Sequence, residues 1–561
     1  MVERLLRIFN REWNGLHEAA FLLAGTAVLS QVLGLVRDRI LAHHFGAGLE
    51  LDIYYAAFRI PDLLYASVAS FVAVTVLIPF LLEKIDGKEG MRSAKAFVNS
   101  VFSAFVLLMI AVCGAAYVLT PYLGQFVVPG FDGVVFDEYV RLSQLLLLSP
   151  LLLGISNLFG SMTQSLRRFF VFAAGPILYN LGIISGIVFL LPHYGVYGVA
   201  LGVVIGAALH VLIQLPVLFH ERIVPRFTFR IDWKEIGRVV RLSIPRTIAL
   251  SSAQLATIVL VKMASDMQLG SIAVFTLAMN LQSIPLSVVG MSYSVAAFPT
   301  LAKLWTGGNK EQFSRQILTA ARHILFWSFP AIVLFVVLRA QIVRTILGSG
   351  AFDWTATRLT AAALALFAIS VVAQNLVLLF TRAFYAMGRT RLPLYANVIG
   401  AVMVVVSSIL LSAAFLQHPV FRYFAETLLR VDDIAGTDVL MLPLGYSVGM
   451  TVNVLLLLFL LRKEFPLIVS GMKKAFLHSF SASVFLGFVA YHSLQVFAWF
   501  FDLDTFLGIF FQGFLSGVLG LLAWAFLLHV LENKEMQEIK SALHRKFWNK
   551  EKPIAAELES F

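Results

Sequence analysis

The stretch NLFGSMTQSLRRFFVFAAGPILYN, residues 157–180, occurs a second time in this chain as NLVLLFTRAFYAMGRTRLPLYAN, residues 375–397. The best-matched positions carry Asn or Pro, and they keep offsets of 218, 217 and 217 residues. They pair Asn157 with Asn375, Pro176 with Pro393, and Asn180 with Asn397. Apolar helices also resemble one another by chance, but polar and helix-bending residues at constant spacing favour an internal repeat. The sequence therefore predicts two copies of one structural unit.

Composition fixes the class of protein. The 561 residues are 59% hydrophobic and 13% charged, with a mean hydropathy of +0.85. Too little polar surface remains to cover a soluble domain, so we predict an all-α integral membrane protein. Stretches long enough to cross about 30 Å of hydrocarbon recur fourteen times. They lie near 19–41, 52–83, 93–123, 140–166, 169–192, 196–219, 240–265, 270–302, 316–347, 356–387, 392–416, 440–461, 475–500 and 505–531.

The basic residues test this count, because short cytoplasmic loops concentrate Lys and Arg. With the N-terminus inside, inner segments hold 32 of the 43 basic residues and outer segments hold eight. A missed or invented span would invert every later loop and destroy this asymmetry. We therefore predict fourteen transmembrane helices with both termini in the cytoplasm.

The repeat divides the spans into two six-helix lobes in a pseudo-twofold arrangement, plus two extra C-terminal helices. Since six is even, both copies enter the membrane from the same side, and transporters built this way bind substrate between their halves. The expected parts are an interfacial amphipathic helix at 1–18, an N-lobe at 19–220, a cytoplasmic linker at 221–239, a C-lobe at 240–461, spans 13 and 14 at 462–531, and a basic cytoplasmic tail at 532–561. The outer segment 417–439 is either a short amphipathic surface helix or a tolerated loop insertion.

Several classes of function are excluded. The net charge of +11 is spread over inner loops that face anionic lipid, so it does not indicate nucleic acid. Cys113 is the single cysteine, and His43 and His44 are adjacent rather than at metal-ligand spacing. No phosphate-cradling Gly-rich loop and no catalytic set of Ser, His and acid appears. We predict a transporter with no catalytic residue, metal or cofactor.

The candidate site lies in the first helical hairpin. Each ionisable group at mid-bilayer depth costs about 2.5–3.5 kcal/mol on insertion scales, so buried charges need partners, water or a charged ligand. In LGLVRDRI, the neighbours Arg37 and Asp38 are expected to point in different directions around the helix. We interpret Arg37 as an anion contact and Asp38 as the residue that orients the arginines. Alternatively, Arg37 and Arg39 extend to the outer headgroups.

The second span, LDIYYAAFRIPDLLYASVAS, supplies the other charges. Asp52 and Arg59 are seven residues apart and share a helical face. Pro61 removes a backbone hydrogen bond and permits a bend just beyond Arg59, which would make this span a moving gate. The alternative is a structural pair of Arg59 with Asp38 or Asp62.

The second copy adds further candidates. Arg246 follows Pro245 in span 7 and either lines the cavity or extends to the inner membrane face. We count Arg37, Asp38, Asp52, Arg59 and Arg246 as substrate-binding candidates. Polar or gating contributors are expected among Pro61, Lys262, Asn280 and Arg382.

Three segments carry a family resemblance. LSQVLGLVRDRILAHHFGAG at 29–48, SIPLSVVGMSYSVAAFPTLAK at 283–303 and RAFYAMGRTRLPLYANVIG at 382–400 resemble the MurJ (MviN) family of lipid II flippases, part of a larger group with multidrug and polysaccharide-lipid exporters. The resemblance implies alternating access and translocation of an undecaprenyl-diphosphate-linked peptidoglycan precursor across the bacterial cytoplasmic membrane. It matches Arg37, Asp38 and Asp52 to family positions.

The chain departs from the family pattern at cationic positions. Gln31, Tyr65, Ala66 and Asn280 stand where the family usually has arginines. Such losses would weaken diphosphate recognition unless Arg59, Arg246 or Lys262 compensates. The acidic position of the family's proposed sodium site falls near Leu260, so sodium coupling is not predicted, while coupling to membrane potential remains open.

The sequence thus predicts a lipid II flippase, with the phospholipid membrane and the lipid-linked diphosphate as its partners. We expect a monomer, with contacts to the cell-wall synthesis machinery left open. The alternatives are an exporter of another lipid-linked oligosaccharide or of a small molecule, and a non-transporting scaffold for envelope synthesis.

Overall fold

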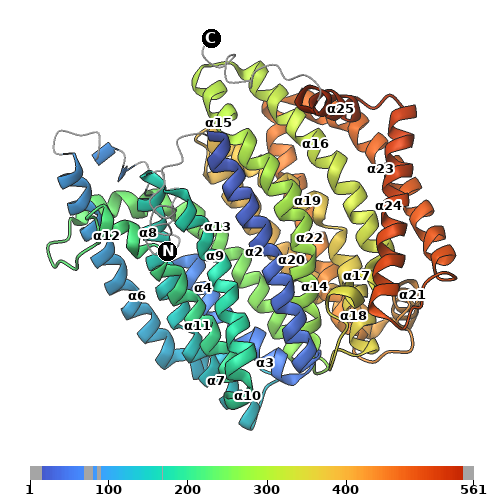
Figure 1. Cartoon of the computed structure of the whole chain (residues 1–561), viewed down its shortest axis with the longest axis horizontal. Helices are drawn as coiled ribbons and strands as arrows, with labels where there is room; N and C mark the ends of the chain where they lie inside the picture. Colours follow the sequence, from blue (N-terminus) through green and yellow to red (C-terminus); the bar gives the residue numbers. More distant parts are fainter. Residues whose placement is uncertain are drawn as a thin grey trace. The chain divides into compact units, whose positions relative to one another are not determined.

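The computed structural model of the chain describes residues 16–68, 77, 80–81, 83–84, 90–166 and 168–547. Every regular element in these residues is a helix (Figure 1). The predicted N-terminal helix at 1–18 falls largely outside the described residues, and so does the end of the basic tail beyond residue 547.

The helices of the predicted first repeat copy include two long ones, α2 (Leu16–Phe45) and α6 (Met91–Val127), and several shorter ones. They are α2 (Leu16–Phe45), α3 (Leu49–Ala57), α4 (Arg59–Ser67), α6 (Met91–Val127), α7 (Gly133–Leu146), α8 (Leu148–Ser165), α9 (Phe169–Ser185), η2 (Gly186–Leu190), α10 (Leu191–Tyr194), α11 (Val196–Leu212) and α12 (Leu215–His220).

The second copy and the C-terminal helices follow. They are α13 (Trp233–Ser265), α14 (Ser271–Pro285), η3 (Leu286–Met291), α15 (Ser292–Thr306), α16 (Lys310–Val337), α17 (Arg339–Ile346), α18 (Trp354–Ala368), α19 (Val371–Ala386), α20 (Arg391–Gln417), α21 (Pro419–Leu429), η4 (Thr437–Leu440), α22 (Met441–Glu464), α23 (Pro466–Phe497), α24 (Phe506–Val530) and α25 (Lys534–Phe547).

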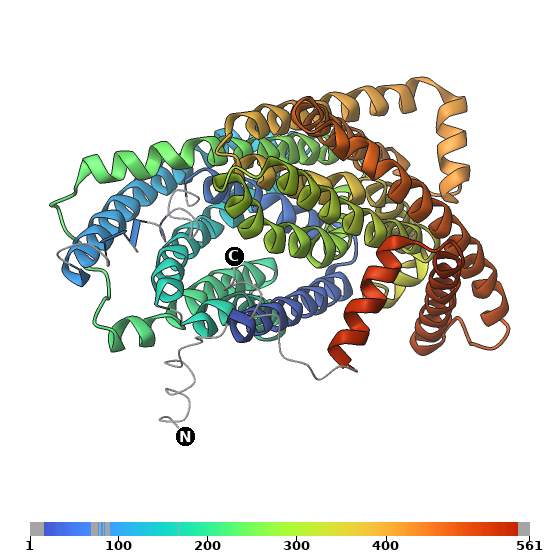
Figure 2. The ribbon, with the colours of Figure 1, turned by 90° about the horizontal axis from the view of Figure 1, so that it is seen from above.

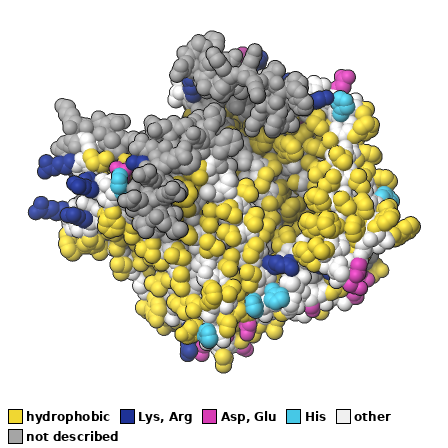
Figure 3. Space-filling view, in the orientation of Figure 1, with side chains coloured by type: hydrophobic (Ala, Val, Ile, Leu, Met, Phe, Trp, Pro, Cys, Tyr) yellow, Lys and Arg dark blue, Asp and Glu magenta, His cyan; other side chains and the backbone are white. Residues whose placement is uncertain are grey.

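Eleven helical segments in the described residues are long and apolar enough to cross a membrane, or twelve if the bent pair α18 and α19 is one span. Large hydrophobic side chains are exposed along many of them, as expected for surfaces solvated by lipid. Hydrophobic side chains also cover much of the face drawn in Figure 3. The chain is therefore an all-helical multi-pass membrane protein.

The helices form two compact units. The first comprises residues 1–281, 346–363 and 393–449, and the second comprises 282–345, 364–392 and 450–561. This division differs from the predicted lobes at 19–220 and 240–461, which stay a prediction. In the second unit, Phe326 of α16, Leu486 of α23 and Trp524 of α24 form a buried apolar core.

In the first unit, small residues bring α9 and η2 close to α11. A Cβ atom added at Gly182 would overlap the backbone of Gly206, and one added at Gly186 would overlap the backbone of Gly202. Glycines at i and i+4 on both partners permit this approach, which is the small-residue packing typical of membrane helices. The close contact gives α9 a fixed position, and α9 carries Asn180.

The segment 417–439 contains a helix, α21, followed by the short η4. At the other end of the chain, α25 packs within the second unit against α16. Arg322 of α16 donates to Glu535 at 2.6 Å, and the His323 ring lies 3.0 Å from Glu538. The described part of the tail is thus a helix bonded to the neighbouring span.

Candidate functional site

The first hairpin is broken where its charges lie. Helix α3 ends at Ala57, Phe58 joins the two elements, and α4 begins at Arg59. The proline ring at position 61 excludes the hydrogen bond and crowds the carbonyl four residues earlier, at Ala57. The helix therefore breaks just before Arg59, and the prediction of a bend just beyond it was wrong by one or two residues. Pro61 itself is buried in the first turn of α4, where a missing N–H costs little.

Arg37 and Asp38 leave the helix in different directions, with Arg37 in the cavity wall and Asp38 bonded to the neighbouring α14, and their side chains also bind each other. Nε and Nη2 of Arg37 donate to Oδ1 of Asp38 at 2.9 and 2.8 Å. The arginine side chain is long enough to fold back over the next residue, whatever the angle between their Cβ atoms. The other carboxylate oxygen, Oδ2 of Asp38, accepts from Asn280 of α14 at 3.0 Å. Asp38 therefore orients Arg37, as predicted, and also binds α14.

Asn180 completes the support of Arg37. Its Oδ1 accepts from Nη1 of Arg37 at 3.2 Å, while its Nδ2 donates to Oγ of Ser30 at 3.2 Å and to the carbonyl of Pro176 at 3.1 Å. The amide is thereby held in one orientation, with its oxygen toward the guanidinium. Asn180 is a repeat-marking residue, which the search for charged side chains did not include among the site candidates.

Arg59 is a buried cation with few partners. Arg59 is 6% exposed. Its Nη2 donates to the hydroxyl of Thr276 of α14 at 3.3 Å, and its Nε has no acceptor within the described part of the chain. Neither Asp38 nor Asp62 comes within salt-bridge distance of Arg59 among the described residues, although the charges of Asp62 and Arg59 attract each other across the cavity wall that they share. Of the predicted structural pairs, a direct contact is therefore not formed, while Asp62 still partly balances the charge of Arg59. A buried charge with so little compensation needs water or an anionic ligand.

Both arginines line one cavity of about 410 Å³ in the first unit. Its walls come from α2, α3, α4 and α9 of the first repeat copy and from α13 and α14 of the second. The lining residues are Arg37, Tyr54, Tyr55, Phe58, Arg59, Asp62, Tyr179, Ile183, Gln254, Thr257, Thr276, Met279 and Asn280. Of the predicted site residues, Arg37, Arg59 and Asn280 are therefore brought together around one space.

Asp52 lies elsewhere and binds backbone. The residue is 2% exposed, and its two carboxylate oxygens accept from the N–H groups of Gly270 at 2.6 Å and Ala273 at 2.7 Å. These donors belong to the first turn of α14, so Asp52 caps that helix from α3. It does not line the cavity.

Further contacts join the two repeat copies beside this cap, all within the first unit. The N–H of Ala351 donates to the carbonyl of His43 at 2.9 Å, and Nη1 of Arg39 donates to the carbonyl of Ile346 at 3.2 Å. A Cβ atom added at Gly270 would overlap the carbonyl of Ala47, and Gly270 has a φ of +91°. The end of α2 and the start of α14 are therefore tightly packed.

The remaining candidates do not line the cavity. Arg246 is half-buried in α13, and the ammonium of Lys262 in the same helix lies 4.5 Å from the centre of the Phe126 ring. Arg382 belongs to the second unit, where its Nη2 lies 3.1 Å from Sδ of Met291. Within the first unit, Arg246 and Lys262 therefore lie outside the wall that carries Arg37 and Arg59.

Comparison with known proteins decides the family. A family model described as "Lipid II flippase MurJ" matches residues 41–511 of this chain. The chain belongs to the MurJ family. It is accordingly a transporter of this family and not an enzyme.

Relatives in the MurJ family are distant in sequence. The "Lipid II flippase MurJ" of Burkholderia cenocepacia is 26% identical over 382 residues, covering 66% of this chain and 73% of that protein. A "Probable lipid II flippase MurJ" of Rhizobium tropici is 27% identical over 405 residues, which cover 70% of this chain and 75% of that protein. A solved structure, "Lipid II flippase MurJ, inward closed conformation", has a TM-score of 0.72 at 23% identity and covers 91% of this chain and all of that one.

The fold is shared more widely. An inward-facing multidrug resistance MATE family transporter of the MOP superfamily gives a TM-score of 0.61 at 16% identity, over 78% of this chain and 96% of that one. Because the sequence identity is so low, this similarity concerns the fold alone.

The structure also places the four neutral residues that the resemblance matches to arginines. Asn280 lines the cavity and donates to Asp38. Tyr65 accepts through its hydroxyl from Nδ2 of Asn157 at 3.0 Å. Ala66 is buried and Gln31 is half-buried.

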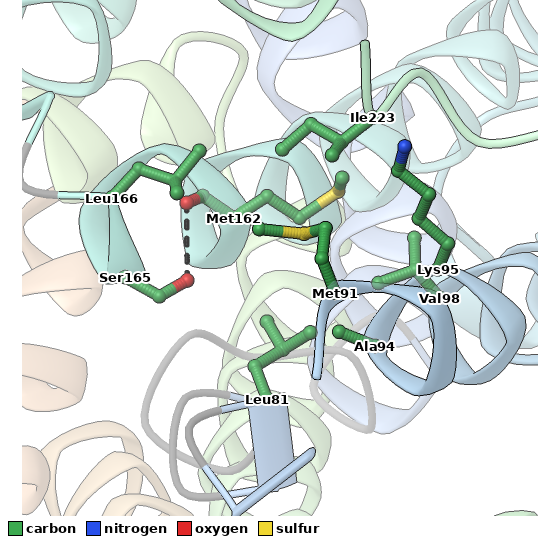
Figure 4. Close-up of a pocket in the computed structure, with 9 residues that line it drawn as sticks. All are labelled: Leu81, Met91, Ala94, Lys95, Val98, Met162, Ser165, Leu166 and Ile223. Carbon is green, nitrogen blue, oxygen red and sulfur yellow. Dashed lines mark hydrogen bonds between the residues drawn. The ribbon is translucent and has the colours of Figure 1, made fainter. Parts of the chain in front are cut away.

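Two other pockets formed by described residues lie in the first unit. One between α6 and α8 is lined by Met91, Val98, Met162 and other mostly apolar residues, and its volume of about 20 Å³ leaves room for little more than one water molecule (Figure 4). The other, of about 380 Å³, is lined mainly by polar and charged residues, but its Lys84 is paired with Glu235. In the described residues, no group of three His, Cys, Asp or Glu side chains is placed to hold a metal ion. The arginine-lined cavity is therefore the candidate site.

Proposed function

We propose that this MurJ family member is a lipid II flippase, which moves an undecaprenyl-diphosphate-linked peptidoglycan precursor from the inner to the outer leaflet of the bacterial cytoplasmic membrane. The observation that carries the proposal is the 410 Å³ cavity with Arg37 and Arg59 in its wall. Guanidinium groups match the paired oxygens of phosphates, and Nε of Arg59 has no hydrogen-bond acceptor among the described residues.

The two arginines differ in what they offer a diphosphate. Arg37 is held by Asp38 and Asn180, so its direction is fixed before the ligand arrives. Arg59 keeps an unbonded Nε and gains an acceptor when a phosphate oxygen reaches it. Tyr54, Tyr55 and Tyr179 supply apolar faces of the kind on which sugar rings pack. The volume falls within the range of about 300–1,000 Å³ for ligand pockets.

We infer fourteen spans for the whole chain. The eleven candidate spans and the bent pair make twelve, and α2 and the broken segment α3–α4 are the two that complete the predicted count. On this topology both termini are cytoplasmic. The lobes at 19–220 and 240–461 would then be related by an axis along the membrane normal, with the cavity walls coming from both copies.

Alternating access requires one side of the cavity to close. The cap of Asp52 on α14 and the bond between Ala351 and His43 join the two copies at the end of α2, which the topology places on the outer side. We propose that these contacts form the outer closure and break when cargo leaves. Membrane potential would act on charges that move with the helices, at about 2.3 kcal/mol per charge per 100 mV.

A second cargo is favoured by one observation. Asp62 also lines the cavity, and Asp38 is bonded to Arg37, so the two arginines are balanced by two carboxylates. A less anionic ligand, such as another lipid-linked oligosaccharide, would suit that balance. A non-transporting scaffold is less well supported, because it has no use for a cavity lined by buried charges.

The test is complementation in cells depleted of their own flippase, scored by lipid II exposure at the outer surface. We expect the wild-type chain to restore exposure, Arg59→Ala to abolish it and Arg59→Lys to retain part of it. The matched control is Arg315→Ala, because Arg315 forms an exposed pair with Glu311 worth little energy. Restored exposure by Arg59→Ala would remove Arg59 from the site, and failure of the wild-type chain would favour another cargo.

A further inference from the structure

Helix α21 lies directly after α20 and has two opposite faces. The chain turns sharply at His418, between the end of α20 at Gln417 and the start of α21 at Pro419 (Figure 2). One face of α21 packs on its own unit, with Glu426 7% exposed and Leu429 8% exposed. The other face is uncovered in this chain.

The uncovered face is an apolar stripe. Val420, Tyr423, Phe424 and Leu428 follow the helical spacing i, i+3, i+4 and i+8. Their exposed fractions are 83%, 67%, 62% and 65%, far above what an apolar side chain keeps when it is packed in a protein core. The stripe is therefore a continuous surface that needs a partner other than water.

Polar contacts fix the packed face in place. Glu426 accepts from Nε of Arg422 at 2.9 Å and from the hydroxyl of Thr437 at 2.5 Å. Beyond the helix, Arg358 of α18 donates from Nη1 and Nη2 to Asp433 at 2.7 and 2.6 Å, and it also donates to the carbonyl of Arg430. This hydrogen bonding lowers the pKa of Asp433 below its ordinary value. The pair is therefore present at neutral pH and is lost only as the pH falls through that lowered pKa.

The stripe continues the lipid-facing surface of α20. That helix is long and apolar enough to span the membrane, and it exposes a row of large apolar side chains. The row runs through Ile399, Val402, Val406, Leu410 and Leu416. Leu416, 68% exposed, is four residues before Val420, so apolar surface passes from the span into α21 with only the turn between them.

We propose that α21 is an interfacial helix whose stripe of Val420, Tyr423, Phe424 and Leu428 inserts into the headgroup–acyl boundary of the leaflet where α20 ends. The partner is the lipid bilayer. Interfacial helices bury their apolar face about 5–10 Å deep, and a tyrosine in such a stripe suits this boundary because its ring is apolar and its hydroxyl is polar. Through Arg358 and Asp433, the anchored segment also fixes the level of the first turn of α18.

A second copy of the chain is a weaker candidate for the stripe. Stable protein interfaces bury about 800 Å² on each partner, and four side chains on an eleven-residue helix offer only a small part of that. The proposal rests on the membrane placement of α20 and not on the cargo, so it stands or falls separately from the proposed flippase activity.

The experiment places a nitroxide label on single cysteines in the full chain with Cys113→Ala, reconstituted in phosphatidylglycerol–phosphatidylethanolamine vesicles. Labels at Phe424→Cys and Leu428→Cys report the stripe, Leu410→Cys is the lipid-exposed reference, and Asp432→Cys is the water-exposed reference. Power saturation with oxygen and with a water-soluble nickel chelate gives the depth of each label. We expect both stripe labels to lie on the order of 5–10 Å below the phosphate level, with lower nickel access than at Asp432.

Nickel access at position 424 equal to that at Asp432 would overturn the proposal. So would spectral broadening that disappears on dilution with unlabelled protein, because it would identify a second copy as the occupant. A second pair of variants keeps the label at Leu428→Cys and changes Phe424→Lys or Phe424→Leu. The lysine should raise nickel access at 428 and the leucine should not, since only the lysine opposes insertion; an equal response to both would also contradict the proposal.

Discussion

At the scale of the residue, the central fact is a buried arginine with no carboxylate within salt-bridge distance. Arg59 is 6% exposed, and its bond to Thr276 leaves Nε without an acceptor in the described residues. An optimised apolar core would not keep such a group, because desolvating a charge costs several kcal/mol. Its place in the cavity wall gives a functional reason for bearing that cost.

Replacing Arg59→Met should therefore stabilise the protein while it removes transport. Methionine fills similar space without a charge, and replacing buried ionic groups by apolar ones is often stabilising by about 1–4 kcal/mol. The check is thermal unfolding of the purified protein in detergent, beside complementation. The control is Arg315→Met at an exposed pair, which should change neither. A lower unfolding temperature for Arg59→Met would indicate that Arg59 holds the fold together.

Asn180→Ala should weaken the cargo site through Arg37. Loss of Oδ1 frees the guanidinium to rotate, and a hydrogen bond to a charged group is worth about 1.5–3 kcal/mol, or roughly 10- to 150-fold in apparent affinity. Binding of labelled lipid II to purified protein measures the effect. Gln144→Ala, at an exposed amide bonded to the carbonyl of Tyr117, is the neutral control. Equal affinity for Asn180→Ala and wild type would contradict a positioning role.

The sequence predicted Arg37, Arg59 and Asn280 of the cavity and missed most of its neutral residues. Arg37 and Arg59 were predictable because a charge in a hydrophobic span is energetically costly in any fold, so a charge that is kept there indicates a function or a partner. Thr276 and Tyr179 carry no such signal, since hydroxyl groups in membrane helices commonly bond to neighbouring helices. The mutual bond of Arg37 and Asp38 was missed because helical angles describe Cβ directions and not the reach of a long side chain.

At the scale of the element, the cap on α14 is the contact most open to a test. Asp52→Ala removes both acceptors for the N–H groups of Gly270 and Ala273, and losing a helix cap costs about 0.5–2 kcal/mol. If this cap belongs to the outer closure, the closure should open more often, by roughly 2- to 30-fold for that energy.

The measurement is labelling of Ser271→Cys, in a Cys113→Ala background, by a membrane-impermeant maleimide added outside cells. Ser271 is 2% exposed, so the label reports opening. Asp52→Ala should raise the labelling rate, and Asp432→Ala, at an exposed carboxylate, should not. Unchanged labelling in Asp52→Ala would mean that the cap does not hold the outer side shut.

The crossing of α9 with α11 should tolerate no added side chain. Gly202→Val places atoms into the backbone of Gly186, and overpacking of this kind costs about 1–3 kcal/mol or more. Folded yield in detergent, measured by size-exclusion chromatography, should fall. Gly114→Val in α6 is the matched control, because a Cβ there meets no atom within 4 Å. Equal yields would show that the helices can move apart without cost.

Helix positions were predicted better than helix breaks. Apolar length places each span, and it located α6, α20 and α24 within a few residues. The break at Phe58 was placed one or two residues too late, because the clash of Pro61 acts on the carbonyl four residues before it. The π-helical turns η2 and η3 were not predicted. No local residue pattern marks where a helix must take up an extra residue in a turn so that its side chains stay packed against the neighbouring helices.

At the scale of the whole molecule, the predicted repeat would give the cavity walls from two copies of one unit. Helices α2, α3, α4 and α9 come from one copy and α13 and α14 from the other, so a change in how the copies meet changes access to Arg37 and Arg59. The assignment of these walls to two repeat copies stays a prediction, made from the repeated Asn, Pro and Asn. The contacts proposed to close the cavity, such as the cap from Asp52 on α14, could not be predicted from the sequence. In that cap the hydrogen-bond donors are backbone N–H groups of a distant helix, and backbone groups leave no pattern in the residue types.

The most direct test of the account is translocation of fluorescent lipid II by the purified protein in proteoliposomes, measured as the fraction that becomes accessible to an added impermeant quencher. We predict translocation by wild type and by Arg315→Ala, and background rates for Arg37→Ala and Arg59→Ala. Wild-type rates in both cavity variants, or no translocation by the wild-type chain in vesicles where a known flippase is active, would contradict the claim that these two arginines carry a diphosphate-linked lipid.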